Sequence, residues 1–103
     1  MKLFKDAIKS PLTRDRYETR LKLALSRMGV EGGTLEDMVR NFVSKARSDN
    51  QWASAIIWSY LHQQKERAER GEISVSTLPN YWKPIKLLCE MNDIAINWKK
   101  ITR

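Results

Sequence analysis

Apolar residues recur along most of this chain at steps of three and four, the spacing that aligns side chains on one face of an α-helix. Stretches that alternate apolar and polar residues, as strands do, are nearly absent. We therefore expect an all-α fold, a compact four-helix orthogonal bundle in which residues 1–103 form a single domain. A short amphipathic lead over residues 3–8 precedes the first helix.

The first two helices are predicted from their caps and their apolar positions. The first spans residues 13–28, with Thr13 as its N-cap and Gly29 as its stop. The second follows a Gly-rich turn, with Thr34 as its cap and apolar residues at helical spacing over residues 35–46. Both helices should bury one face against the rest of the bundle.

The third and fourth helices are expected after similar signals. The third begins at a capping box over residues 48–51 and stops at Gly71. Its strongly charged end, residues 63–70, is expected to lie in solvent. The fourth helix, over residues 76–92, follows a short extended segment at residues 73–77.

Two positions in the last third of the chain leave the backbone open to alternatives. Pro84 falls inside the fourth helix, where it removes one backbone hydrogen bond, so either a kink or a late helix start is expected. Residues 97–103 either cap one last turn or begin a linker to a further domain.

The tryptophans are expected to pack in the core, because one of them falls on the apolar face of the fourth helix. Stacking on nucleic-acid bases, as in a single-strand binding platform, is the alternative. The chain contains Trp52, Trp58, Trp82 and Trp98.

Charge points to a polyanionic partner. Nineteen Lys and Arg residues face twelve Asp and Glu residues, which gives a formal net charge of +7. Such a field concentrates around nucleic acid, although basic residues also serve solubility alone. Nucleic acid is therefore the first partner to consider.

The residue types offer no catalytic site, cofactor site or metal site. Cys89, the one cysteine, lies at an apolar helical position and is expected to be a buried, inert thiol. His62, the one histidine, is expected at the surface without a partner of the kind a nucleophile or base needs. The glycines lack the spacing of a phosphate-binding loop.

Neither end of the chain nor its interior carries a membrane signal. Asp6 interrupts the first apolar residues before they form a signal-peptide core, and no apolar run is as long as a membrane span. We expect a cytoplasmic protein with no membrane partner and no small-molecule substrate.

Basic residues lie on one edge of the first predicted helix. At 100° per residue, Arg16, Arg20, Leu23 and Arg27 fall in one narrow strip, roughly perpendicular to the apolar face. Three guanidinium groups that share an edge are suited to phosphate contacts.

A second polar strip lies on the predicted fourth helix. Ser76, Asn80, Lys83 and Leu87 oppose its apolar face, with Lys86 beside them. Asn can pair with adenine and Lys with a phosphate, which favours DNA contact. The alternative is that any amphipathic helix places its charges on the solvent side.

Two apolar residues on that same solvent side suggest a different function. Leu87 and Met91 would form an exposed patch for another domain or subunit. The second hypothesis is therefore a stand-alone helical module that binds another protein through this patch.

Two stretches share a Thr-x-x-x-Tyr-x-x-x-apolar pattern some sixty residues apart. They are Thr13, Tyr17 and Leu21, and Thr77, Tyr81 and Ile85. The pattern resembles the SAM-like, N-terminal core-binding domain of tyrosine recombinases, the phage integrase family. Residues 81–100 are similar to archaeal integrase sequences in particular.

The resemblance implies site-specific binding of duplex DNA during DNA integration and recombination. In that family the domain forms one jaw of a C-shaped clamp, two helices cross the major groove, and a basic linker leads to the catalytic domain. The implied partners are double-stranded DNA, a catalytic domain of the same polypeptide, and further copies of the protein on DNA. The implied contact residues are Thr13, Arg14, Arg16, Arg20, Arg27, Ser76, Thr77, Asn80, Lys83 and Lys86.

The family's chemistry uses a tyrosine nucleophile with Arg, His and Lys residues of a larger C-terminal domain. This chain is therefore expected to bind DNA without cutting it. Its long third helix, with the charged end, departs from the family pattern.

Overall fold

The fold is built from helices joined by short turns. The computed structural model describes residues 8–102, and no strand occurs among them. The predicted lead at residues 3–8 lies outside the described residues except for Ile8, which is in no helix. The elements are α1 (Pro11–Arg27), α2 (Leu35–Ser48), α3 (Asn50–Glu69), the 3₁₀ turn η2 (Val75–Thr77), α4 (Pro79–Met91) and α5 (Trp98–Ile101). The all-α prediction is confirmed, whereas the structure adds a short fifth helix to the expected four.

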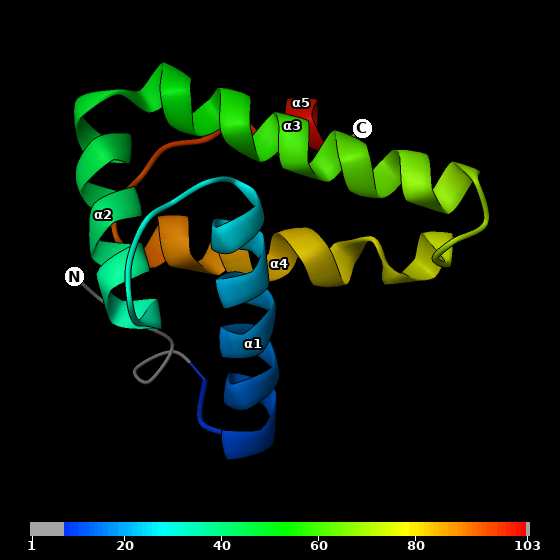
Figure 1. The fold of residues 1–103 in the computed structure, drawn as a ribbon, viewed down its shortest axis with the longest axis horizontal. Coiled ribbons are helices and arrows are strands. Elements are labelled where there is room, and N and C mark those ends of the chain that lie inside the picture. The colour runs from blue at the N-terminus through cyan, green and yellow to red at the C-terminus, as the bar shows by residue number, and fades with distance from the viewer. Residues whose placement is uncertain (1–7, 103) are drawn as a thin grey trace.

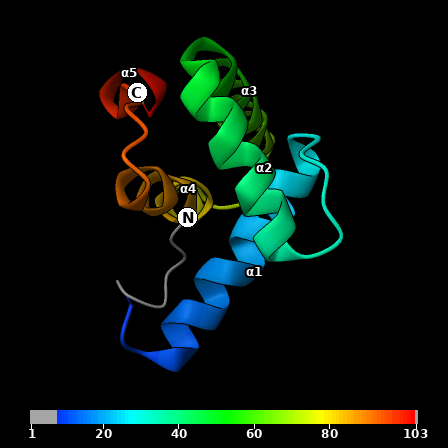
Figure 2. The ribbon, with the colours of Figure 1, turned by 90° about the vertical axis from the view of Figure 1, so that its left-hand side faces the viewer.

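The longer helices cross in two places, where α1 meets α4 and where α2 meets α3. In Figure 1, α3 runs along the top, α4 returns beneath it, and α1 crosses α4. Figure 2 shows α4 nearly end-on, with α5 beside α3. Among the helix pairs, α1 packs most extensively against α4, and α2 against α3.

One buried cluster holds these helices together. Its members come from every helix longer than one turn, at the three-and-four spacing of each helix, and from Ile94 in the segment after α4. Removing such side chains from water contributes about 1.5–3 kcal/mol each, which fixes the faces that the helices turn inward. The largest apolar side chains at the centre are Leu21, Leu25, Phe42, Ile57, Ile85 and Leu88.

The start of α1 differs from the prediction. The helix begins at Pro11, and the Ser10 hydroxyl accepts a hydrogen bond from the Thr13 backbone N–H at 3.4 Å. Thr13 as the N-cap was wrong, because proline fits the first helical position, where no N–H is needed. Gly29 follows the last turn with a φ of 80°, and the predicted stop is confirmed.

Of the predicted N-caps of α2 and α3, the first is confirmed and the second is wrong. Thr34 caps α2 as predicted, since its hydroxyl accepts a hydrogen bond from the Asp37 N–H at 3.1 Å. At α3 the cap is Asp49, whose carboxylate accepts from the Trp52 N–H at 3.0 Å. Ser48, the predicted start of a capping box, is the last residue of α2. A carboxylate is the better acceptor for an N-terminal amide.

The approach to α4 is helical, where an extended segment was expected. Residues 75–77 form η2, capped by Ser74, and α4 begins at Pro79. Thr77 lies in this turn and does not cap α4. The helix continues through Pro84, so the late start that we considered was wrong. Proline at the first helical position again sets the boundary.

The end of α3 is more buried than its composition suggested. Gln64 is 1% exposed and Arg67 is half-buried, although residues 63–70 were expected in solvent. Gln64 lies four residues after Tyr60 and continues its buried face. Gly71, with a φ of 77°, ends the helix as predicted.

The last described residues form a capped turn. The Asn97 side-chain oxygen accepts a hydrogen bond from the Lys100 N–H at 3.1 Å, which is the first of the two alternatives considered. The preceding segment is tied to α2 and α3. Arg47 donates to the Asn92 carbonyl at 3.0 Å, and Asn50 donates to the Ala95 carbonyl at 2.7 Å.

Phe42→Ala should lower the free energy of unfolding by about 3–5 kcal/mol, because it leaves a cavity in a fully buried position. Leu12→Ala, at a residue that is 62% exposed, should change it by less than about 0.5 kcal/mol. Urea unfolding monitored by circular dichroism measures both. Equal effects of the two substitutions would contradict the assigned core.

The Cys89 thiol should resist modification in the folded protein. It is fully buried, and burial, followed by the negative charge of Glu90, raises its pKa to about 12. Because the thiolate is the reactive form, Ellman's reagent at pH 8 should react at least about 100-fold more slowly with folded than with guanidinium-unfolded protein. Similar rates in the two states would show an accessible thiol.

Candidate nucleic-acid interface

A hollow forms where α1 crosses α4. Its lining combines three cations with a hydroxyl, an amide and a tyrosine ring. The two basic strips that were predicted on separate helices therefore meet at one place on the surface. The lining residues are Thr13, Arg16, Tyr17 and Arg20 of α1, and Asn80 and Lys83 of α4.

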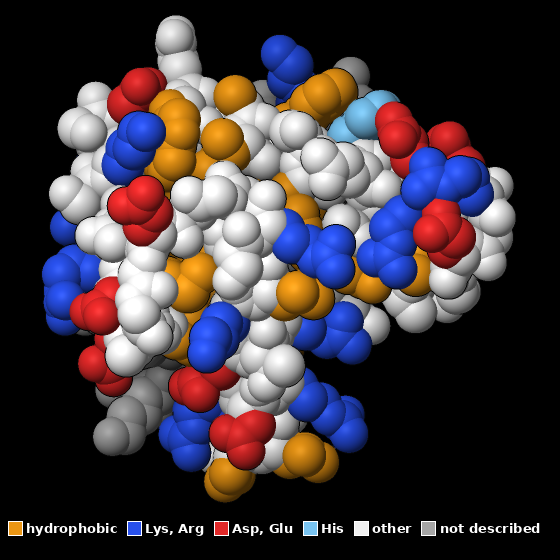
Figure 3. Space-filling model, viewed as in Figure 1, with side chains coloured by type: hydrophobic (Ala, Val, Ile, Leu, Met, Phe, Trp, Pro, Cys, Tyr) orange, Lys and Arg blue, Asp and Glu red, His pale blue; other side chains and the backbone are white. Residues whose placement is uncertain are grey.

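One edge of α1 carries cations and the opposite edge carries acids. The apolar face, buried at Leu21 and Leu25, turns both edges to the sides of the helix. At 100° per residue, Asp15 and Glu18 fall on the edge away from the hollow. In Figure 3, Lys and Arg side chains follow one another along one side of α1. The cationic edge holds Arg16, Arg20, Leu23 and Arg27, all exposed.

No carboxylate among residues 8–102 forms an ion pair with the cations of the hollow. The ion pairs found within residues 8–102 join Arg40 to Asp37, and join Glu66 and Glu72 to residues near the end of α3. None of these pairs includes Arg16, Arg20 or Lys83. Like charges that gather without counter-charges raise the local potential and attract an anionic ligand. The hollow is therefore an anion-attracting surface.

The Arg20 guanidinium is held by an aromatic ring. Its central carbon lies 5.9 Å from the centroid of the Tyr81 ring, a cation–π contact between α1 and α4. The contact limits the rotamers of Arg20 and aims its hydrogen-bonding fork. The tyrosine of the repeated sequence pattern on α4 thus supports a cation that comes from α1.

Several predicted contact residues on α4 and η2 lie outside the hollow. Thr77 donates its hydroxyl hydrogen to the Ser74 carbonyl at 2.6 Å, and the Ser76 and Ser74 hydroxyl oxygens are 2.7 Å apart. Their hydroxyl groups therefore stabilise the turn before α4. The Lys86 ammonium lies 5.6 Å from the centroid of a Trp82 ring, on the other flank of the helix.

Two predicted arginines of α1 also lie elsewhere. Arg14 is half-buried on the side of the helix that faces the core, away from the cationic edge. Arg27 is exposed on the cationic edge, but near the opposite end of the helix from the hollow. The structure thus separates Arg14 from the other arginines and keeps Arg27 in line with them.

No protein family, curated protein or solved structure was found to match the chain.

The outer face of α3 carries a stacked pair that the sequence did not indicate. The rings of Trp58 and His62 lie 4.8 Å apart at an interplanar angle of 8°, and His62 Nε2 lies 3.0 Å from a Glu66 carboxylate oxygen. Trp58 is 49% exposed, so core packing was wrong for this tryptophan. His62 is exposed, as predicted. It does have partners, because steps of four along the helix place Trp58, His62 and Glu66 in a row.

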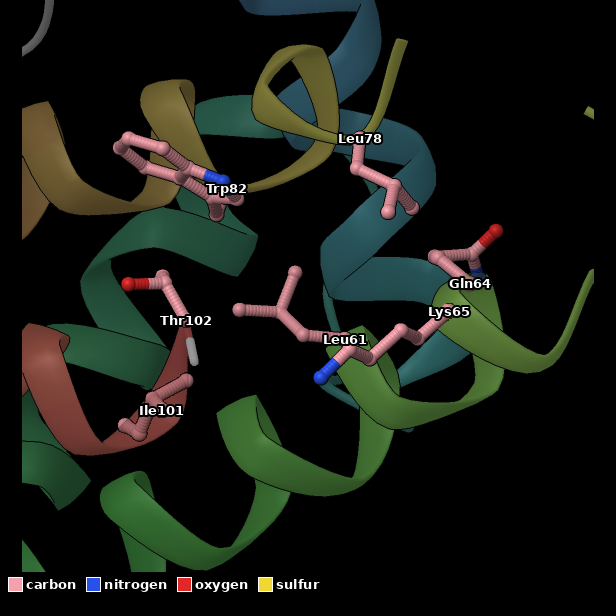
Figure 4. A pocket seen from close by; sticks show the side chains of 7 residues that line it. All are labelled: Leu61, Gln64, Lys65, Leu78, Trp82, Ile101 and Thr102. Atoms are coloured by element: carbon pink, nitrogen blue, oxygen red, sulfur yellow. The ribbon is translucent and has the colours of Figure 1, made fainter. Parts of the chain in front are cut away.

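A second hollow lies between α3, α4 and α5. Its volume of about 50 Å³ is well below the several hundred cubic ångströms of typical ligand sites. Figure 4 shows Leu61, Trp82 and Ile101 around it, with the Gln64 amide directed away. No group of three metal-ligating side chains occurs among the described residues.

No helix within residues 8–102 has both the length and the apolar character that crossing a membrane requires.

The burial of Gln64 near the end of α3 was missed by the sequence reasoning. Gln64 accepts a hydrogen bond from Arg67 at 2.8 Å, and Tyr60 is 3% exposed. Burial, and then Tyr81, raise the pKa of the Tyr60 hydroxyl, while the charges of Arg27, Arg67 and Arg20 act in the opposite direction. The steps of four and three from Tyr60 to Gln64 and Arg67 were the signal that could have identified this group.

The contact between Arg20 and Tyr81 predicts a measurable coupling. A double-mutant cycle with Arg20→Gln and Tyr81→Leu should give a coupling energy of about 0.5–1 kcal/mol in urea unfolding, as expected of an exposed cation–π pair. The cycle of Arg16→Gln with Tyr81→Leu serves as the control and should give a value near zero. Equal coupling energies in the two cycles would show that the Tyr81 ring makes no specific contact with Arg20.

Proposed function

We propose that this chain binds duplex DNA with the hollow between α1 and α4 and the adjoining edge of α1. One observation carries the proposal: Arg16, Arg20 and Lys83 come from two helices, lie around one hollow and lack carboxylate partners within the described residues. Cations that stabilise no ion pair in the fold are free to neutralise phosphates.

The side chains around the hollow divide into two kinds of DNA contact. Arg16 and Lys83 are suited to the phosphate backbone, which sets position without reading sequence. Arg20, aimed by its ring contact, and Asn80 are suited to base edges, since Arg pairs with guanine and Asn with adenine in the major groove. The Thr13 hydroxyl completes the set with a neutral donor.

The proposed wider role is that of the core-binding domain of a tyrosine recombinase, which acts in DNA integration and recombination. The repeated pattern supports this role, because both of its tyrosines lie at the crossing of α1 and α4. Tyr17 lines the hollow and Tyr81 supports Arg20. In this role the chain binds DNA in the cytoplasm without cutting it, and partners a catalytic domain of the same polypeptide and further copies on DNA.

The alternative of a protein-interaction module has less support. Leu87 and Met91 are partly buried and pack against the core, so they form no free apolar patch. The exposed large apolar residues of the described chain are Leu12, Leu23, Trp58 and Val75.

Reversing two charges at the hollow tests the proposal. Arg16→Glu with Lys83→Glu should weaken binding to a duplex of about 20 base pairs by at least about tenfold in low salt. The slope of log affinity against log salt should become less negative by about 1.8, since two phosphate contacts are lost. Fluorescence anisotropy measures both quantities.

The matched control is Lys22→Glu with Lys99→Glu, which changes net charge equally at two exposed positions outside the hollow. It should affect affinity much less. If both double variants lost affinity equally, net charge alone would explain the effect. If Arg16→Glu with Lys83→Glu left the affinity unchanged, the proposed interface would be rejected.

A further inference from the structure

An exposed leucine lies within the cationic edge of α1. Leu23 is 45% exposed, follows Arg20 by three residues and precedes Arg27 by four. At 100° per residue, these three side chains fall within about 60° of one another around the helix. A ligand that contacts both arginines therefore also covers Leu23.

Packing within the fold does not explain this position of a large apolar side chain. The buried face of α1 is formed by Leu21, Ala24 and Leu25 instead. Single exposed apolar residues are common on proteins, so exposure alone would indicate no ligand. Leu23 is distinguished by its neighbours, because the two arginines beside it belong to no ion pair found within residues 8–102.

The side chains on the other flank of Leu23 are uncharged. Thr19, four residues before it, donates its hydroxyl hydrogen to the Asp15 carbonyl at 2.9 Å. Ser26, three residues after it, donates to the Lys22 carbonyl at 2.8 Å. Both hydroxyl hydrogens are thus bonded within the helix. Leu23 is bordered by cations and by uncharged side chains, and an anionic ligand can approach it.

We propose that Leu23 contacts thymine methyl groups in the major groove of the bound duplex, so that the cationic edge prefers A·T base pairs there. This inference rests on the proposed function and names a feature of DNA that the edge recognises. The C5-methyl group of thymine is the apolar group that base pairs present in the major groove. The other groups are hydrogen-bond donors and acceptors, which a leucine would remove from water without offering them a partner.

The position of Leu23 relative to Arg20 supports this contact. The Arg20 guanidinium is held 5.9 Å from the centroid of the Tyr81 ring, and we assign it to a base edge. Leu23 lies three residues further along α1, or roughly 4.5 Å at 1.5 Å per residue. Because successive base pairs rise by roughly 3.4 Å, the two side chains meet the same or adjacent base pairs.

Replacing thymine by uracil in the DNA tests this contact, because the two bases differ only in the methyl group. The probes are a duplex of about 20 alternating A·T base pairs and the same duplex with deoxyuridine in place of every thymidine, which present methyl groups, or none, in every binding register. The unaltered chain should bind the thymine duplex about threefold to fivefold more tightly in fluorescence anisotropy, as expected when one methyl-sized group is removed from water.

Leu23→Ala should reduce this preference to less than about 1.5-fold, because the shorter side chain no longer covers the methyl group. The slope of log affinity against log salt should stay the same, since no phosphate contact is lost. Val75→Ala is the matched control, because it shortens an apolar side chain that is 70% exposed in η2, outside the cationic edge. It should keep the preference for thymine. Circular dichroism checks that both variants fold.

The outcomes separate this inference from the proposed function. Equal binding of the two duplexes by the unaltered chain, or an unchanged preference in Leu23→Ala, overturns the thymine contact. An equal loss of preference in Val75→Ala overturns it as well. The proposed function stands in these cases if Arg16→Glu with Lys83→Glu still weakens binding. If the unaltered chain binds neither duplex, the proposed function fails, and the thymine contact fails with it.

Discussion

The crossing of α1 over α4 is the contact on which the surface of this protein depends. Leu21 and Leu25 on α1 and Ile85 and Leu88 on α4 belong to one fully buried cluster. Because burying these faces stabilises the fold, the rotation of each helix about its axis is set by its apolar residues. This rotation also fixes where the flanking side chains lie. The polar edges of α1 and α4 therefore meet at one hollow.

Charge is distributed unevenly over the helices. Arg40 on α2 and Arg70 at the end of α3 have carboxylate partners, whereas Arg47 on α2 donates to the Asn92 carbonyl. The arginines on the edge of α1, and Arg67, have no carboxylate partner among the described residues. Exposed ion pairs contribute little to stability, so the cations of α1 and α4 are not explained by folding alone. In the proposed function, the phosphates of DNA supply this counter-charge.

Sequence periodicity predicted what depends on the helical repeat and missed what depends on local competition. The apolar faces and the cationic edge of α1 follow from 3.6 residues per turn, and both were predictable. The N-caps of α1 and α3 were not, because Ser10 competes with Thr13, and Asp49 with Ser48, for the same backbone amides. Which of several adjacent capping groups is used depends on the path of the chain before the helix.

The polar end of α3 shows a second limit of sequence reasoning. Gln64 continues the buried face of Tyr60, but its polarity suggested solvent. Periodicity and residue type disagreed at this position, and periodicity was correct because Arg67 satisfies the buried amide oxygen. Trp58 is the converse case, a large apolar ring that gains its packing partner, His62, on the outer face of the helix.

Mapping the amide chemical shifts of the chain during titration with a short duplex tests the central claim most directly. The account predicts that the largest changes occur in α1 from Thr13 to Arg27 and in the first turns of α4. Changes confined to α2, or to the Trp58 face of α3, would contradict it.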